Sequence, residues 1–426
     1  MKKKFLIIWA NSGLTTKSNH VNAPYHFIHV GEVVNFLNKK LNNSVDILDI
    51  EACQIEFSDI MKSIIDNDYK SIAFYVNTEN VDNSLKILEY IKVINPKCKN
   101  IAYGELPLYL PKFFKNTKFD AIVNCNCDQE AAIMDFFQYS DYKKDINDLC
   151  GITLIINNNM MKTNSGRYLS PDEWGFTEPV ESPIYKYFIM EKKEQYVMTT
   201  SRGCPYGCKY CNATLYYGKK ERFRPVSQII NFINSHSFEY YKFFSPNFTL
   251  NKAMAYSLCE ELIKNKKKIK WSCTTRPDLI CDEKLVSLMS KSGCYKIAVG
   301  IESISQKDLS NIDKRYKNEY IIKGVSLLKK YDIEYKALVM FGLPNQTKDD
   351  IICTIEFFEQ LGIKIRPTAY TPYYEMNYNM NSEQISKYDK RTYYEGIEGI
   401  SYSQFLQLIY NTDNYKKILN IGELDV

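Results

Sequence analysis

Short apolar runs alternate with longer segments of helical spacing over the first third of the chain. The first run, Phe5–Trp9, is followed by Val30–Leu41, in which apolar residues recur every three or four positions. Further strand-like runs are Val45–Ile50, Ser71–Val76, Lys99–Tyr103 and Ala121–Val123. Further helical segments are Phe57–Ile65, Leu85–Ile94 and Gln129–Phe137. Such alternation with short connections predicts an α/β fold, with a doubly wound parallel sheet over residues 1–140.

A second series of strand-like and helix-like segments begins at Gln195. Its predicted strands are Tyr196–Thr200, Tyr240–Phe244, Lys270–Thr274, Lys296–Gly300, Tyr335–Phe341 and Lys364–Tyr370. The helices between them are Val226–Ser235, Lys252–Lys264, Glu283–Lys291, Asn318–Tyr331 and Lys348–Leu361. Strands of this kind predict a partial (β/α)6 barrel over residues 195–370, with the chemistry carried by loops at the C-terminal strand ends.

Two less regular segments flank the second series. Residues 141–194 lack a clear period and contain the turn signals Asn157–Asn159 and Ser170-Pro-Asp, so we interpret them as a linker. Residues 371–426 are interpreted as a C-terminal extension made of a loop and one or two short helices.

Charge and hydropathy exclude several classes of protein. The chain has 55 Lys and Arg against 50 Asp and Glu, a formal net charge of +5, and the basic residues are scattered. This distribution gives no electrostatic footprint for nucleic acid. No apolar run approaches the ~18 residues that a membrane-spanning helix needs. The run Phe5–Ala10 is shorter than the apolar core of a signal peptide. We therefore expect a cytoplasmic protein that binds neither nucleic acid nor membrane.

The cysteines bring in candidate chemistry. There are 13 of them, an odd number in a chain without an export signal, so metal binding or simple burial is expected rather than disulfide bonds. Most have no metal-binding spacing and fit the role of buried, small apolar groups. The exception is Cys204-x3-Cys208-x2-Cys211, which directly follows the predicted strand Tyr196–Thr200.

Three cysteines so closely spaced can bind three irons of a [4Fe–4S] cluster, because Gly203, Pro205 and Gly207 let the loop fold around it. The fourth iron then has no nearby protein ligand and could be chelated by the amino and carboxylate groups of S-adenosylmethionine (SAM). Reduction could then release a 5′-deoxyadenosyl radical. The alternatives fit less well. Zinc needs a fourth ligand, and the nearest downstream histidine is His236 on another loop. A redox C-x-x-C pair would leave Cys204 idle.

The cysteine loop resembles the signature of the radical SAM superfamily, including the aromatic residue before the third cysteine. The resemblance implies that Cys204, Cys208 and Cys211 hold the cluster and act catalytically through it. It also implies that Tyr210 lies against the adenine of SAM. Gly300-Ile-Glu302-Ser303 is similar to the family's Gly-x-Glu-Ser element after the fourth strand, whose glutamate contacts SAM.

Further candidate SAM contacts stand at the ends of the second and third predicted barrel strands. Ser245 and Asn247 occupy the place where family members carry an acidic residue for the amino group of SAM. Their oxygens can accept a hydrogen bond from an ammonium group, but more weakly than a carboxylate can. Arg276 could hold a carboxylate of SAM or substrate, or pair with Asp278. Gly342-Leu-Pro-Asn-Gln-Thr347 resembles the family's turn after strand five.

The first domain resembles the cobalamin-binding domain that precedes the barrel in one group of radical SAM proteins. Ala23-Pro-Tyr and Val30-Gly31-x-Val33 are similar to that group's segment after strand one, and Asn77–Asn80 occupies the loop where relatives meet the corrin. Where relatives have Gly-Gly-Pro, this chain has Tyr103-Gly104-Glu-Leu-Pro, and Asn124–Asp128 replaces their Gly-Glu-Gly/Pro-Glu. A bulky Tyr stands where backbone must approach a large flat ligand. Cobalamin binding is therefore left open.

The leading hypothesis is a radical SAM enzyme that abstracts hydrogen from a C–H bond of a small molecule or peptide. It would need a one-electron reductant such as flavodoxin or ferredoxin. If cobalamin binds, we expect C-methylation with methylcobalamin as donor; without it, the radical could serve a dehydratase, epimerase, mutase or peptide-modifying enzyme. The hypothesis from another class is a non-catalytic iron–sulfur or zinc-binding scaffold, because Asn345 and Gln346 depart from the family's pattern.

Overall fold

The computed structural model describes residues 4–10, 25–50, 55–124, 126–177, 189–190 and 193–421. The chain divides into two compact units. The first unit is made of Met1–Pro205, Asn212–Arg224 and Tyr373–Tyr388. The second unit is made of Tyr206–Cys211, Pro225–Pro372 and Asp389–Val426.

The first unit is built on one sheet with the strand order β2-β1-β3-β4-β5-β6-β7. The strands are β1 Phe5–Trp9, β2 Val45–Asp49, β3 Ser71–Tyr75, β4 Lys99–Tyr103, β5 Ala121–Val123, β6 Ile152–Ile156 and β7 Asn159–Lys162. Strands β1 to β5 pair in parallel, and β6 and β7 continue the sheet antiparallel. The predicted parallel sheet is confirmed. Its strand order reverses between β1 and β3, the kind of place where open α/β sheets bind ligands.

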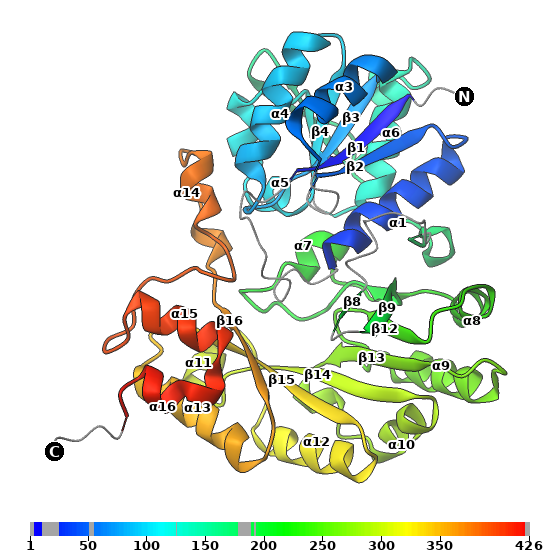
Figure 1. The fold of residues 1–426 in the computed structure, drawn as a ribbon. Coiled ribbons are helices and arrows are strands. Elements are labelled where there is room, and N and C mark those ends of the chain that lie inside the picture. Colours follow the sequence, from blue (N-terminus) through cyan, green and yellow to red (C-terminus); the bar gives the residue numbers. More distant parts are fainter. Residues whose placement is uncertain are drawn as a thin grey trace. The chain divides into compact units, whose positions relative to one another are not determined.

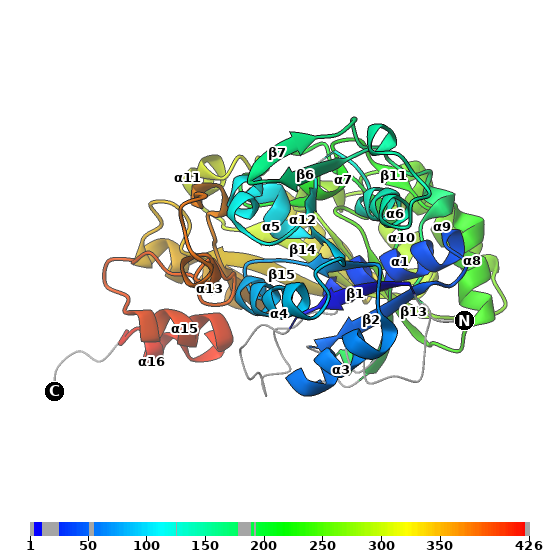
Figure 2. The ribbon, with the colours of Figure 1, turned by 90° about the horizontal axis from the view of Figure 1, so that it is seen from above.

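Helices cover both faces of this sheet (Figures 1 and 2). They are α1 Tyr25–Lys40, α3 Phe57–Asn67, α4 Val81–Ile94, α5 Glu105–Tyr109 and α6 Gln129–Ser140. Side chains of a strand alternate between the faces. Leu6 and Ile8 join the core that contains buried residues of α3 and α4. Phe5 points to the other face and stacks on Phe137 of α6, with 4.5 Å between ring centroids.

Part of the predicted linker belongs to this sheet. Strands β6 and β7 form a hairpin whose turn residues Asn157 and Asn158 have φ of 50° and 58°, the left-handed conformation that asparagine tolerates. The two strands are too short to show a period in the sequence, which is why only the turn was recognised. The segment Tyr373–Tyr388 of the C-terminal extension also joins the first unit, where Met376 and Ile385 are buried.

The predicted strand at the start of the second series forms as β9 (Lys193–Thr199), which pairs with β8 (Ile189–Met190). The second unit contains five parallel strands that neighbour one another in chain order. They are β12 Tyr240–Phe244, β13 Lys270–Thr275, β14 Cys294–Glu302, β15 Glu334–Phe341 and β16 Ile365–Ala369. Within the described residues they do not close into a complete barrel, in agreement with the predicted partial barrel.

Helices alternate with these strands, as expected for βα units (Figure 1). They are α8 Val226–Ser235, α9 Lys252–Lys264, α10 Glu283–Lys291, α11 Gln306–Asn311, α12 Glu319–Lys330 and α13 Lys348–Gln360; the extension adds α14 Ser382–Ser386, α15 Tyr402–Tyr410 and α16 Tyr415–Ile418. Side chains cap the starts of several of these helices: Asn251, Asp282 and Thr347, for example, each accept a hydrogen bond from a backbone N–H of the first turn. Such caps satisfy donors that a helix start leaves unpaired.

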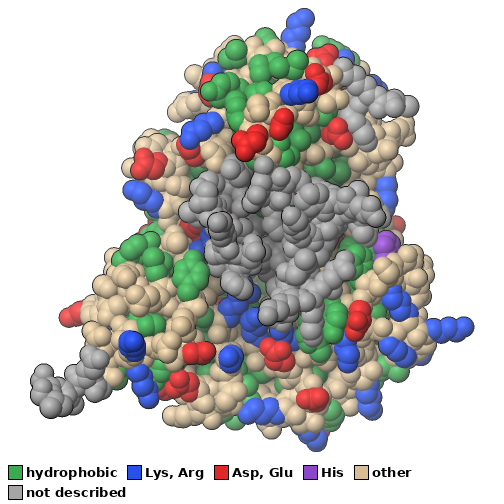
Figure 3. Space-filling model, viewed as in Figure 1, with side chains coloured by type: hydrophobic (Ala, Val, Ile, Leu, Met, Phe, Trp, Pro, Cys, Tyr) green, Lys and Arg blue, Asp and Glu red, His purple; other side chains and the backbone are tan. Residues whose placement is uncertain are grey.

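The surface carries mixed charge. Figure 3 shows acidic and basic side chains interspersed over the visible face of the described part. Among the helices that the structure describes, none combines the length and the apolar character needed to span a bilayer.

Candidate functional site

The cysteine loop follows the short strand β10 (Ser201–Arg202). Gly203 has φ 95°, and a side chain there would collide with the carbonyl oxygen of Lys220, so only glycine fits this turn. The backbone N–H of Cys211 donates to the carbonyl oxygen of Cys208 at 3.0 Å, which makes a tight turn between these two cysteines. Cys204 is buried, Cys208 is half-buried and Cys211 is exposed.

None of the cysteines in the described part of the chain is in a disulfide bond, so the three thiols keep the donor chemistry that an iron–sulfur cluster needs. No group of three or more His, Cys, Asp or Glu side chains among those residues is arranged to hold a metal ion. The assignment of a cluster to Cys204, Cys208 and Cys211 therefore remains a prediction from their spacing.

Tyr210 connects the cysteine loop to the end of strand β14. Its hydroxyl donates a hydrogen bond to Oε1 of Glu302 at 2.8 Å. The ammonium group of Lys314 is 2.6 Å from the same Oε1 and 3.2 Å from the hydroxyl of Tyr210. Burial and the charge of Glu302 hold the pKa of Tyr210 well above its usual value, so this phenol stays protonated and remains a donor. The structure thus brings together two predicted site residues and adds a lysine.

The backbone at Glu302 is strained. Its φ is 66°, which is rare for a residue other than glycine, and the pairing register of β14 with β15 shifts at this point. The hydroxyl of Tyr316 fastens the strand end by donating to the carbonyl oxygens of Ile301, at 2.7 Å, and Ser303, at 2.9 Å. Strain that neighbouring groups hold in place is typical of functional sites.

Arg276 lies at the end of the neighbouring strand β13. Its guanidinium group donates to Asp278 at 3.0 Å and to the carbonyl oxygen of Arg315 at 2.9 Å. The same group stacks over the ring of Tyr206, in the cysteine loop, at 4.0 Å from the ring centroid. The pairing with Asp278 that the sequence left open is therefore present. Tyr206 is thus a second aromatic side chain of the cysteine loop, after Tyr210, that contacts a residue at the end of a strand.

The other predicted SAM contacts differ in how their polar groups are used. Ser245 is buried, and its hydroxyl has no hydrogen-bond partner among the described residues. Asn247 is also buried. Ser303 donates to Asp308 at 2.8 Å, and Gln346 donates to the same carboxylate oxygen at 3.0 Å. Ser303 is thus part of an internal network, whereas the unpartnered hydroxyl of Ser245 suits a polar ligand.

Lys314 and Tyr206 were not singled out from the sequence. Lys314 belongs to a stretch of mixed charge after α11 that reads as solvent-exposed, yet its side chain is only 4% exposed. The sequence did contain one signal for a buried lysine: Glu302 directly follows an apolar strand, and a buried glutamate needs a counter-charge.

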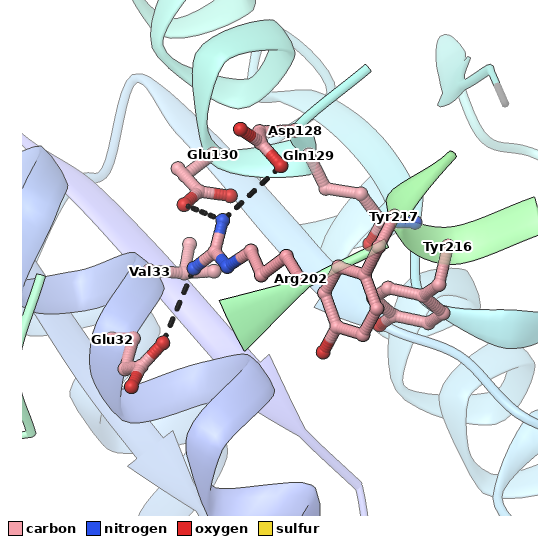
Figure 4. A pocket seen from close by; sticks show the side chains of 8 residues that line it. All are labelled: Glu32, Val33, Asp128, Gln129, Glu130, Arg202, Tyr216 and Tyr217. Carbon is pink, nitrogen blue, oxygen red and sulfur yellow. Dashed lines mark hydrogen bonds and ion pairs between the residues drawn. The ribbon is translucent and has the colours of Figure 1, made fainter. Parts of the chain in front are cut away.

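A second buried charge cluster lies in the first unit. Arg202, two residues before Cys204, contacts three carboxylates (Figure 4). The distances from its guanidinium nitrogens are 2.7 Å to Glu130, 3.1 Å to Glu32 and 3.2 Å to Asp128. Arg222 forms a bidentate pair with Asp128, at 2.6 and 2.9 Å. The cluster therefore fixes the strand that leads into the cysteine loop.

The sequence of this chain is similar to those of known proteins. A family model described as the radical SAM superfamily matches residues 198–358. An uncharacterized methyltransferase of Pyrococcus horikoshii is 25% identical over 343 residues, which are 78% of this chain and 73% of that protein.

Two solved structures share the fold. The radical SAM methyltransferase TsrM from Kitasatospora setae, solved with cobalamin and a [4Fe–4S] cluster, has a TM-score of 0.71 at 15% identity and covers 88% of this chain and 77% of its own. The cobalamin-dependent SAM radical enzyme OxsB, solved with aqua-cobalamin and SAM, has a TM-score of 0.68 at 17% identity. The match covers 100% of this chain and 63% of OxsB. At such identity the likeness shows the fold.

Proposed function

We propose that this chain is an enzyme that abstracts hydrogen from a C–H bond of a small molecule or peptide. The premise is that residues 198–358 are a radical SAM domain. Cys204, Cys208 and Cys211 are the ligands of a [4Fe–4S] cluster in this proposal. When bound and reduced by a donor such as flavodoxin or ferredoxin, the cluster would supply, by reductive cleavage of SAM, the 5′-deoxyadenosyl radical for hydrogen abstraction.

The observation that carries the proposal is the hydrogen bond between Tyr210 and Glu302. It joins the residue before the third cysteine to the carboxyl end of β14, the end where βα folds carry their chemistry. In this proposal Tyr210 would lie against the adenine of SAM, and Glu302, oriented by Lys314, would accept hydrogen bonds from its sugar. In the proposal, Ser245 and Asn247 would accept from the amino group, and Arg276 would bind a carboxylate of SAM or of the substrate.

The test is anaerobic reconstitution with iron, sulfide and a reductant, followed by addition of SAM. We expect a broad [4Fe–4S] absorbance and formation of 5′-deoxyadenosine. Absence of any SAM cleavage product from a reconstituted chain would contradict the proposal.

A pair of variants tests the site. Cys208→Ala should lose most of the cluster absorbance, because a cluster held by two thiolates is weakly bound. Cys353→Ala is the matched control, since Cys353 is an exposed thiol on α13, and it should retain the absorbance. Metal analysis separates the non-catalytic alternative: one zinc and no sulfide would favour a zinc-binding scaffold.

Methyl transfer to the substrate carbon is the second candidate, favoured by the similarity to the Pyrococcus methyltransferase and to TsrM. Its readout is a product heavier by one methylene group. The cobalamin-dependent form of this reaction depends on whether the first unit can hold a corrin.

A further inference from the structure

Aromatic side chains close the carboxyl edge of the first unit's sheet. The neighbouring strands β1, β3 and β4 all end in one: Trp9, Tyr75 and Tyr103. These three residues are directly paired in the sheet register, so their side chains lie on the same face. The ring centroids are 5.7 Å apart between Trp9 and Tyr75 and 5.5 Å apart between Tyr75 and Tyr103. We call this set the aromatic row.

The aromatic row stands at the point where the strand order reverses, which is where a ligand of an open α/β sheet is expected. Tyr75 and Tyr103 are completely buried, and Trp9 is 6% exposed. A cavity of the first unit is lined by residues of α1 and β10, by the start of α6 with Asp128 before it, and by Tyr216 and Tyr217 of helix α7 (Ala213–Tyr217) (Figure 4). Its volume is about 20 Å³. That is room for about one water molecule, whereas ligand pockets measure roughly 300–1,000 Å³.

The loops at this edge use their polar groups on one another. After β3, the side-chain oxygens of Asn77 and Asn80 accept from each other's backbone N–H at 2.9 Å. After β4, both backbone groups of Gly104 are bonded to the side-chain amide of Gln129, at 3.0 and 3.2 Å. A side chain at Gly104 would meet the carbonyl oxygen of Val76 at 2.7 Å, so this glycine serves packing within the protein.

A further polar residue at this edge, Asp128, is also bonded within the protein. Asp128, in the segment after β5, pairs with Arg202 and Arg222 and accepts from the backbone N–H of Leu169 at 2.8 Å. Among the described residues of this edge, the polar groups of Asn77, Asn80, Gly104 and Asp128 are bonded within the protein, whereas the buried hydroxyl of Tyr103 has no partner. The space that these residues leave does not fit a corrin.

We propose that the first unit does not bind cobalamin and that its ligand edge has become an anchor for the strand leading to Cys204. The aromatic row fills the corrin position, and the buried carboxylates Glu32, Asp128 and Glu130 hold Arg202. The radical generated by the second unit is then used without a corrin methyl carrier. The reaction class is hydrogen abstraction followed by dehydration, epimerisation, rearrangement or crosslinking. This goes beyond the proposed function, and its test does not depend on that function.

The experiment uses the full chain, incubated anaerobically with an excess of hydroxocobalamin and then desalted. We expect almost no corrin absorbance to remain with the protein, and an unchanged Tm when hydroxocobalamin is present during heating. Retention of close to one corrin per chain, or a clear rise in Tm, would overturn the proposal. Protein isolated from cells that take up cobalamin provides the same readout for loading during folding.

The two proposals fail in different ways. If no 5′-deoxyadenosine forms but the chain also retains no corrin, the radical SAM assignment fails and the exclusion of cobalamin stands. If 5′-deoxyadenosine forms and its rate rises on addition of hydroxocobalamin, the exclusion fails and the assignment stands. We expect 5′-deoxyadenosine formation at the same rate with and without the corrin.

Discussion

Lys314 is the counter-charge of the buried carboxylate of Glu302, and the two side chains are 4% and 7% exposed. Breaking a buried pair by removing one partner leaves an uncompensated charge, which costs about 3–5 kcal/mol. We therefore predict that Lys314→Met lowers the free energy of unfolding by about 3 kcal/mol, measured by urea denaturation without cofactors.

Two further variants make this prediction specific. Lys317→Met removes a lysine that is 77% exposed and should change stability by less than about 0.5 kcal/mol. The double variant Lys314→Met/Glu302→Gln removes both charges and should recover most of the loss. Equal losses for the two lysine variants would mean that Lys314 contributes only its packing.

Tyr103 and Tyr316 differ in the hydrogen bonding of their buried hydroxyl groups. Both are buried, but the hydroxyl of Tyr103 has no hydrogen-bond partner among the described residues, whereas that of Tyr316 donates to two carbonyl oxygens. An unsatisfied buried hydroxyl costs about 1–3 kcal/mol. We predict that Tyr103→Phe raises the free energy of unfolding by about 1 kcal/mol and that Tyr316→Phe lowers it by a similar amount. Thermal or urea denaturation measures both, and a loss for Tyr103→Phe would mean that its hydroxyl is bonded.

At the scale of elements, Arg202 connects β10 to two helices. Glu32 lies on α1, and Asp128 and Glu130 lie at the start of α6. Burial opposes the ionisation of Asp128, but Arg202 and Arg222 hold its pKa below the usual value. Burial has the larger effect on Glu130, whose pKa is raised. The arginine thus decides whether this group of carboxylates can remain buried together.

We predict that Arg202→Met destabilises the protein by at least about 3 kcal/mol, because it leaves three carboxylates without their shared partner. Urea denaturation, with hydrogen exchange to localise the effect, measures this loss, and reduced protection of α1 and α6 is expected. Lys219→Met, in the loop after α7, is the control and should have little effect because Lys219 is exposed. Unchanged protection of both helices in Arg202→Met would contradict the anchoring role.

At the scale of the whole molecule, buried phenols limit stability at high pH. Burial holds the pKa values of five tyrosines well above the usual value of 10, and they occur in both units: Tyr75, Tyr103, Tyr210, Tyr216 and Tyr316. The unfolded chain releases these protons near pH 10 while the folded chain keeps them. A raised pKa in the folded state therefore contributes stability that is present below pH 10 and is lost as pH rises above it.

We predict that the free energy of unfolding falls steeply above about pH 10, with each buried phenol adding up to about 1.4 kcal/mol per pH unit. Tyrosinate absorbance and circular dichroism, followed together during alkaline titration, provide the test. Exposed tyrosines should titrate first, and the buried ones only as the circular dichroism is lost. Complete tyrosine titration in a chain that is still folded would contradict the burial.

Sequence alone determined the features that depend on neighbours along the chain. The period of apolar residues in segments such as Phe5–Trp9 and Lys348–Leu361 predicted the βα units, because a strand or helix must bury one face whatever it packs against. The spacing of Cys204, Cys208 and Cys211 predicted the cluster ligands, because ligands that close in sequence share one loop. The short hairpin β6–β7 was missed because four or five residues are too few to show a period.

Only the tertiary structure decided which distant side chains meet. It paired Glu302 with Lys314 and Tyr210, separated by 12 and 92 residues, and placed Arg276 over Tyr206. It also brought three aromatic residues at the ends of separate strands into one row across the carboxyl edge of a sheet. Strand register and helix packing decide such contacts, and they depend on the whole chain. The spacing within one loop therefore predicted the cluster ligands, whereas the packing at the carboxyl edge of the sheet is visible only in the fold.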